Sequence, residues 1–292
     1  MTPATTAREL LEEAEERLRR SPAIEHWPAQ RERWDSEQLL SFVLGLDEEE
    51  APDPDEVVDA RRAGRFRELV RRRAGGEPLA HVFGWMTFRG LRLSVGPEAF
   101  VPRQSSEFMV EQALRRLRGR RRPVAVDLAT GVGPVALAVS HALRRAQVHA
   151  TDLSALALRL ARRNARDLRL RNVVFHRGDL FGALPGRLRG TVDVITIHPP
   201  YVPPDEVADL PLEIRGFEPE STLTDFSPHG LGLAERAAVE ARAWLRPGGW
   251  LLVEVSPDRA RSVRGLLVRA GYRQVRSTIG WPQVTRVIVG RS

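Results

Sequence analysis

The chain has 292 residues, 42% of them hydrophobic and 28% charged, so it is long enough for two globular domains and ordinary in composition. It contains no cysteine, which excludes disulfides, thiolate metal sites and cysteine nucleophiles. No apolar run approaches the roughly 20 residues that span a bilayer, and the N-terminus lacks the apolar stretch of a signal peptide. We therefore expect a cytoplasmic protein with no membrane partner.

The net charge is +7, and all 45 basic residues are arginine. This uniform choice fits a genome-wide codon preference better than selection for a nucleic-acid surface, although arginine suits phosphate and carboxylate partners. The densest arginine run, residues 115–122, falls between a predicted helix and a predicted strand. We favour a solvated linker over a contact patch for RNA or an acidic partner, and we do not expect nucleic acid to be the substrate.

Residues 1–76 are predicted to form a small helical domain that binds a partner. Thr6 and Glu9 form a capping box at the start of a first helix, and Gly45 fits the C-terminal cap of a second. Asp53 followed by Pro54 predicts the start of a third helix.

Residues 77–103 change to short β-like runs, HVFGWMTF and LRLSV, separated by Arg89 and Gly90. This pattern predicts a β-hairpin that links two domains. A helix capped by Ser105 or Ser106 is expected to follow.

Residues 104–292 alternate between strands and helices, which predicts an α/β domain with a mostly parallel sheet. The turn between the last two strands contains Gly280 and Pro282 and is too short for a helical crossover, so we expect one reversed strand. The predicted strands are Val124–Leu128, Gln147–Ala150, Val173–His176, Val192–Ile197, Trp250–Val255, Tyr272–Ser277 and Val284–Val289.

A glycine-containing loop follows the first strand of this domain. The glycines allow a sharp turn and a close approach to a ligand, and the helix that follows offers free amides. The loop and the acid that precedes it comprise Asp127, Ala129, Thr130, Gly131, Val132 and Gly133.

Two further acids follow the next two strands: Asp152, before Leu153, and Asp179, before Leu180. A carboxylate at the first of these positions typically holds the hydroxyls of a ribose, and the second could accept from an exocyclic amine of a base. The glycines with Asp152 also fit a nicotinamide dinucleotide fingerprint. However, Asp127 would repel a pyrophosphate and suits the cationic amino-acid part of S-adenosylmethionine, so we favour the sulfonium cofactor.

The segment Thr191–Tyr201, TVDVITIHPPY, predicts a buried parallel strand that ends at His198, Pro199, Pro200 and Tyr201. Ligands of open α/β sheets bind at this edge. The two prolines remove amide donors, so the neighbouring carbonyls can point at a ligand, and Tyr201 can form a wall.

Taken together, the segments DLATGVG, TDLS, GDLF and HPPY resemble a class I methyltransferase of the N-methylating kind, with a Rossmann-like sheet. FVPRQSSE, FEPESTL, RPGGWLLVEV and TRVIVGR narrow the resemblance to the release-factor glutamine methyltransferase family, almost end to end. The resemblance implies methylation of a glutamine side-chain amide in a peptide-chain release factor, with S-adenosylmethionine as cofactor and no metal.

The resemblance also implies residue roles. His198, Pro199, Pro200 and Tyr201 would be catalytic and hold the substrate side chain, together with Phe100, Arg103 and Glu107. The cofactor would contact the loop and acids named above, with His198: Asp127, Ala129, Thr130, Gly131, Val132, Gly133, Asp152, Leu153, Asp179 and Leu180.

Several positions depart from the family pattern. His198 stands where the family has asparagine, Ala129 replaces a glycine, Ser105 a glutamate and Ser256 a glycine. Neutral histidine can keep the acceptor role of asparagine, or it can serve as a base for an amine or hydroxyl of a small molecule. A cofactor-binding protein without turnover and, ranked last, an NAD(P) oxidoreductase are the other interpretations. Ala129 is expected to be tolerated if its φ is negative.

Overall fold

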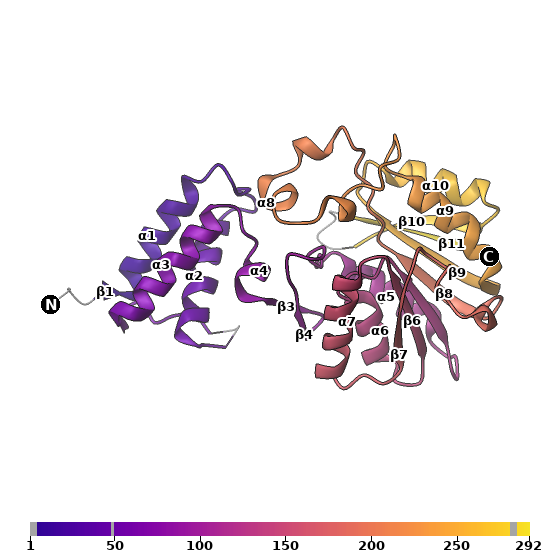
Figure 1. Ribbon diagram of the computed structural model, residues 1–292, viewed down its shortest axis with the longest axis horizontal. Coiled ribbons are helices and arrows are strands. Elements are labelled where there is room, and N and C mark those ends of the chain that lie inside the picture. The colour runs from indigo at the N-terminus through magenta and orange to yellow at the C-terminus, as the bar shows by residue number, and fades with distance from the viewer. Residues whose placement is uncertain (1–4, 48–49, 281–284) are drawn as a thin grey trace. The chain divides into compact units, whose positions relative to one another are not determined.

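A computed structural model of the chain describes residues 5–47, 50–280 and 285–292. Contacts between its residues define two compact units (Figure 1). The helical unit comprises Met1–Gly84 and Ala208–Phe217, and the sheet unit comprises Trp85–Val207 and Glu218–Ser292.

The helical unit packs three longer helices around a core of leucines, with Phe66 at its centre. The predicted capping box is confirmed at α1, where Glu9 N donates to Thr6 Oγ1 and Thr6 N donates to Glu9 Oε2. Gly45 caps α2 with a φ of +80°, as expected. The elements of this unit are β1 (Thr5–Thr6), α1 (Ala7–Arg19), α2 (Arg31–Leu44), β2 (Val57–Val58), α3 (Ala60–Ala74), α4 (Leu79–Phe83), η2 (Val207–Asp209, which spans the boundary) and α8 (Leu212–Arg215).

Two local predictions in this region were wrong. The third helix begins at Ala60, capped by Asp59, and not at Pro54, because the intervening residues enter the short β2 strand that pairs with β1. The first half of HVFGWMTF lies in α4, which Gly84 ends with a φ of +76°. The hairpin itself is confirmed and is shorter, with β3 (Trp85–Phe88) paired to β4 (Leu91–Ser94).

A buried cluster of charges ties the segment after the HPPY motif to the helical unit. Arg73, 1% exposed, donates to Asp35 at 2.6 Å and to Glu213 at 2.8 Å, and Arg31 donates to both oxygens of Glu213 at 2.8 Å. Burial alone would raise the pKa of Glu213, but the two guanidiniums outweigh it and hold that pKa below its usual range. Removing one member of such a buried cluster leaves an uncompensated charge.

The sheet unit is built on a seven-stranded sheet in the order β10-β11-β9-β8-β5-β6-β7. Only β11 runs against its neighbours, so the predicted single reversed strand is confirmed. Pro282, which we placed in the turn before this strand, and Val284, which we placed at its start, lie outside the described residues. The strands are β5 (Val124–Leu128), β6 (Gln147–Asp152), β7 (Val173–Arg177), β8 (Val192–Ile197), β9 (Leu245–Val255), β10 (Arg273–Ile279) and β11 (Arg286–Arg291).

Helices cover both faces of the sheet (Figure 1). The helices α5, α6 and α7 pack on one face, and α9 and α10 pack on the other, each over a continuous apolar core. The helices of this unit are α5 (Ser106–Leu117), α6 (Pro134–Ala142), α7 (Ala155–Asp167), η1 (Gly186–Leu188), η3 (Glu220–Thr222), α9 (Gly232–Glu240), η4 (Ala241–Ala243) and α10 (Ala260–Arg269).

We predict that Glu213→Gln lowers the free energy of unfolding of the helical unit by about 3 kcal/mol or more, because Arg73 keeps a buried charge with one partner fewer. Urea unfolding, with hydrogen exchange read out in α2 and α3, measures the change. Glu68→Gln, at an exposed position of α3, is the matched control and should change little. Equal effects of the two substitutions would contradict the assigned role of the cluster.

Candidate functional site

The loop 129–133 joins the carboxyl end of β5 to α6. Gly133 caps α6 with a φ of +89°, and Gly131 has a φ of +56°. A Cβ built on Gly131 meets no atom within 4 Å, so its backbone faces open space. Thr130 and Val132 are buried and anchor the loop from beneath. The loop therefore presents bare backbone toward a space that a ligand can occupy.

Asp152, at the end of β6, fixes this loop to its neighbour. Its Oδ2 accepts from Gly131 N and its Oδ1 from Ser154 N, both at 2.8 Å. Burial outweighs these bonds and raises the pKa of the carboxyl group. A carboxylate has about four acceptor positions, and the backbone of Gly131, Leu153 and Ser154 occupies up to three of them, which leaves room for a hydroxyl of a ligand. The next side chain, Leu153, is 65% exposed and offers an apolar surface beside the acid.

Asp127 lies beneath the loop and is 4% exposed. It accepts from Thr130 Oγ1 at 2.6 Å and from Thr196 Oγ1, on β8, at 2.7 Å. Burial, only partly offset by these bonds, raises the pKa of Asp127 to about 6. The carboxylate is therefore mostly ionised at pH 7 and supplies negative charge directly below the loop.

Ala129 is strained. Its φ of +51° lies in the left-handed region that favours glycine. The condition under which we expected alanine to be tolerated here, a negative φ, is not met. Leu180, after β7, also has a positive φ of +42° and is buried.

His198 follows β8 and sits between two aromatic rings. Its ring centroid lies 5.5 Å from Phe100, edge to face, and 5.8 Å from Tyr201, at an interplanar angle of 13°. Its Nδ1 lies 3.3 Å from Ser106 Oγ and 3.9 Å from Glu254 Oε2. Burial, with Arg103 adding to it and Glu254 opposing it, lowers the pKa of His198, so the ring is neutral at pH 7.

Glu254 is a functional candidate that the sequence analysis did not identify. It is fully buried near the end of β9, and its Oε1 accepts from Ser105 Oγ at 3.3 Å. Among the described residues, nothing donates a hydrogen bond to its Oε2, the atom nearest His198. The only feature of the sequence that could have identified it is the single acid within the apolar run WLLVEV. Together with burial, Glu254 raises the pKa of Tyr201 to about 12.

Arg103 lies over the Phe100 ring, 4.3 Å from its centroid, and donates to the buried Glu218 at 2.7 Å. These contacts join the FVPR and FEPE segments beside His198. Glu107, in contrast, accepts from the backbone N of Arg89 in the hairpin, at 2.8 Å. Of the residues we placed near the substrate, the structure thus brings Phe100 and Arg103 to His198 and directs Glu107 to the hairpin.

Asp179 follows β7 at the same edge of the sheet. It is exposed and pairs with Arg236 of α9 at 2.6 Å. An exposed pair of this kind is weak, so a ligand can displace the arginine.

The fold and this edge of the sheet define a class I methyltransferase. A solved structure with this fold is the T. thermophilus 16S rRNA N2 G1207 methyltransferase (RsmC) in complex with AdoMet and guanosine. It is 17% identical and aligns over 71% of this chain and 49% of that chain with a TM-score of 0.51. At this identity the likeness shows the fold alone. No described helix is both long and apolar enough to cross a membrane.

Sequence comparisons identify the family. Residues 9–84 match the PrmC N-terminal domain, and residues 104–210 match the methyltransferase small domain. Release factor glutamine methyltransferases are 37% identical in Bordetella pertussis (88% of this chain, 94% of the relative), 38% in Xylella fastidiosa (89% and 93%) and 38% in Streptomyces coelicolor (76% and 77%). The chain belongs to the release factor glutamine methyltransferase family.

We predict that Ala129→Gly raises the free energy of unfolding by up to about 1.6 kcal/mol. The substitution removes the strain of a left-handed alanine, which is roughly 1–2 kcal/mol. It also stabilises the unfolded state by about 0.4–1 kcal/mol, because glycine gives the unfolded chain more conformational freedom. Chemical denaturation measures the change. Ala136→Gly, within α6, should instead destabilise, and a similar loss at both positions would contradict the strain at Ala129.

Proposed function

We propose that the chain transfers a methyl group from S-adenosylmethionine to the side-chain amide nitrogen of a glutamine in a peptide-chain release factor. The observation that carries the proposal is the pairing of β5 with β8, in which Leu128 lies opposite Ile197. This register places the loop 129–133 and the HPPY motif side by side. Family membership supplies the class of substrate.

The residues fit the cofactor. The open space at Gly131, the carboxylate of Asp152 and the exposed Leu153 suit the amino-acid part, the ribose and an apolar base face, respectively. Asp127 would attract the ammonium group of the cofactor. Asp179 would accept a hydrogen bond from the amine of the base after its ion pair with Arg236 opens. When bound, the cofactor supplies a methyl group on a sulfonium ion.

His198 would orient and deprotonate the acceptor. An amide nitrogen is a poor nucleophile because its lone pair is delocalised, so acceptors on its two hydrogens must align it. The oxygens of Glu254 and Ser106 near Nδ1 favour a proton on that atom, which leaves Nε2 free to accept. The amide nitrogen gains one N–C bond and loses one proton, and neutral His198 can take that proton.

The other acceptor would be a backbone carbonyl of the HPPY turn. His198 and Pro199 each precede a proline, so no amide hydrogen follows their carbonyls. The stacked Tyr201 would close one side of the substrate pocket, and its raised pKa keeps the hydroxyl protonated.

We assign release-factor binding to the helical domain, residues 1–76, with 77–103 as linker and 104–292 as catalytic domain. Trp27 and Trp34 support this assignment because they are 68% and 56% exposed, and tryptophan is enriched at protein interfaces. A substrate of this kind places the protein in the cytoplasm, where translation occurs.

The direct test incubates the purified chain with a release factor and S-adenosylmethionine and maps the product by mass spectrometry. We expect one methyl group on a glutamine side chain. Modification of a small amine or hydroxyl, with none on the release factor, would overturn the substrate assignment.

Substitution of His198 tests its role. We predict that His198→Ala lowers kcat by about 10²-fold, because general-base and orienting contacts are lost. His198→Asn should lower kcat less than His198→Ala, since its amide keeps a hydrogen-bond acceptor for orientation but cannot take the proton. An alanine variant as active as the unmodified chain would show that His198 does not contact the acceptor.

Cofactor affinity should depend on pH through Asp127. With a pKa of about 6, the carboxylate is mostly protonated at pH 5.5 and mostly ionised at pH 7.5, so affinity should fall about fourfold between pH 7.5 and pH 5.5. Isothermal calorimetry measures it. Asp127→Asn should bind more weakly with little pH dependence, and an equal pH dependence in that variant would assign the titration to another group.

A further inference from the structure

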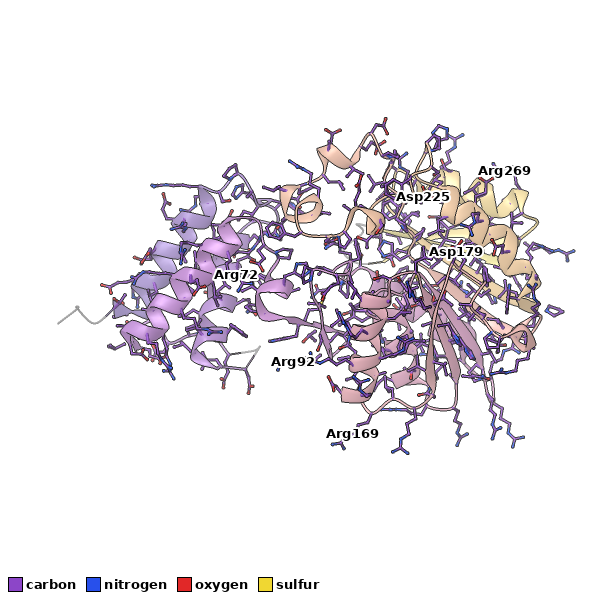
Figure 2. All side chains as sticks on the ribbon, viewed as in Figure 1. Arg72, Arg92, Arg169, Asp179, Asp225 and Arg269 are labelled. Atoms are coloured by element: carbon purple, nitrogen blue, oxygen red, sulfur yellow. The ribbon has the colours of Figure 1, made fainter. Side chains whose placement is uncertain are left out.

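The edge of the sheet opposite the methyl-transfer site carries an unusual density of arginine. Apart from β11, all strands of this sheet run in the same direction, so the segments that enter them meet at one edge. We call this edge the arginine edge. It comprises the segments 118–122, 144–145, 169–171 and 187–189, with the pocket described below. Long side chains with nitrogen ends project there, beside the labelled Arg169 (Figure 2).

Most of these charges have no acidic partner. Asp193 pairs with Arg120 at 3.4 Å and with Arg246, and Asp167 pairs with Arg163 at 3.6 Å. All arginines of the four segments are exposed. Apart from Arg120, they lie beyond ion-pair distance of any carboxylate that the structure describes. The carboxyl ends of the strands hold Asp127, Asp152 and Asp179 instead. A codon preference explains arginine in place of lysine, but it does not explain this separation of charge.

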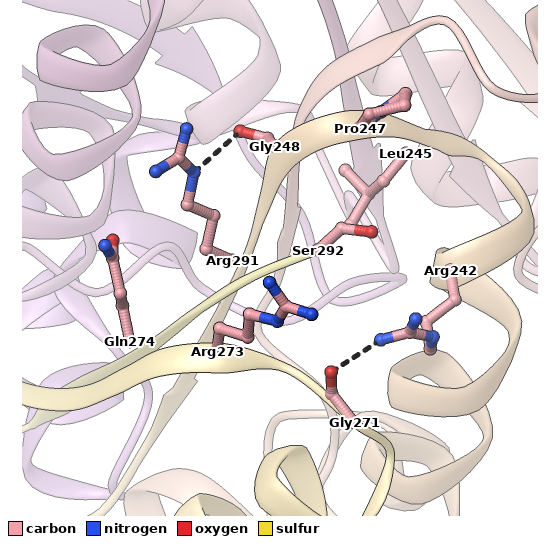
Figure 3. A pocket seen from close by; sticks show the side chains of 9 residues that line it. All are labelled: Arg242, Leu245, Pro247, Gly248, Gly271, Arg273, Gln274, Arg291 and Ser292. Atoms are coloured by element: carbon pink, nitrogen blue, oxygen red, sulfur yellow. Dashed lines mark hydrogen bonds between the residues drawn. The ribbon is translucent and has the colours of Figure 1, made fainter.

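A pocket of about 740 Å³ extends the edge across β9, β11 and β10 (Figure 3). Arg242, Arg273 and Arg291 line it. Arg242 donates to Gly271 O at 2.8 Å and Arg291 to Gly248 O at 3.4 Å, and both lie over aromatic rings, those of Tyr272 and Trp250. Figure 3 shows Arg273 between these two arginines. Contacts of this kind hold guanidinium groups in place while leaving donors for a ligand.

The order of the segments makes a continuous track. Along the sheet the segments 169–171, 144–145, 118–122 and 187–189 enter neighbouring strands β7, β6, β5 and β8, and the pocket follows. With strands about 4.8 Å apart, the track is roughly 30 Å long. A small anion would occupy one part of it, whereas an extended polyanion can occupy all of it.

We propose that the arginine edge binds the phosphate backbone of RNA while methyl transfer takes place at the opposite edge. Arginine binds phosphate through paired N–H donors, and the regular charge of a nucleic-acid backbone matches a long track better than the scattered acids of a folded protein. Because the two edges are separate, both can be occupied at once. The inference does not depend on which acceptor is methylated.

Fluorescence anisotropy with a labelled single-stranded RNA of mixed sequence tests the proposal on the full chain. The edge variant carries Arg→Glu at Arg121, Arg122, Arg144 and Arg145. The matched control carries the same change at four exposed arginines of the helical unit that have no ion pair among the described residues: Arg17, Arg61, Arg65 and Arg71.

We expect the edge variant to lose more than about tenfold in affinity, with a salt slope smaller by about 3, since each lost phosphate contact contributes roughly 0.7 on a single strand. The control should keep its salt slope, and the edge variant should still methylate a release factor. If the glutamate variant does not fold, as judged by circular dichroism, the four glutamine substitutions replace it.

Four results would overturn the proposal. The first is that the unmodified chain does not bind RNA, and the second is that the edge variant and the control lose equal affinity. The third is that polyaspartate or anionic phospholipid vesicles bind more tightly than RNA at the same ionic strength. The fourth is that the edge variant loses release-factor methylation. The last result would assign the edge to an acidic protein.

Discussion

The pairing of β5 with both β6 and β8 is the constraint on which the site depends. Chain order reverses at this point in the sheet, so β5 and β8 lead into segments on opposite faces, which is where ligands of open α/β sheets bind. Asp127 reinforces the arrangement because its carboxylate accepts hydrogen bonds from Thr130 in the loop and from Thr196 in β8. One buried acid thus links the loop 129–133 to β8, the strand that leads into the HPPY motif, and supplies negative charge beneath the loop.

Three of the four departures from the family pattern meet in space. Ser105, His198 and Ser256 are far apart in sequence, yet Ser105 bonds to Glu254, His198 lies beside the same acid, and Ser256 forms a side-chain hydrogen bond with Tyr201. A glutamate at position 105 would bring a second carboxylate to Glu254, whereas serine brings a neutral donor. The three substitutions therefore fit together, because each changes a polar group close to the histidine.

Much of the fold was predictable because its signals are local. Apolar runs located the seven strands of the large sheet, although β9 begins five residues earlier than predicted and the short strands β1 and β2 were not predicted. Thr6 and Gly45 identified helix ends through their own side chain or conformation. Residues whose roles depend on distant partners were not predictable. Glu213 forms its ion pairs with arginines more than 130 residues away in sequence. In the sequence Glu254 resembles an ordinary strand residue, and only the folded sheet brings it beside His198. The positive φ of Ala129 likewise follows from the loop's path and not from its residue type.

The central claim is that the cofactor binds at the carboxyl edge of the sheet, between β5 and β8. Ultraviolet crosslinking of labelled S-adenosylmethionine to the full chain, followed by peptide mapping, tests this claim most directly. The account predicts label in peptides that contain residues 127–133, 152–153 or 198–201, and less label when Asp152 is replaced by alanine. Label concentrated in peptides of the arginine edge, unaffected by Asp152→Ala, would contradict it.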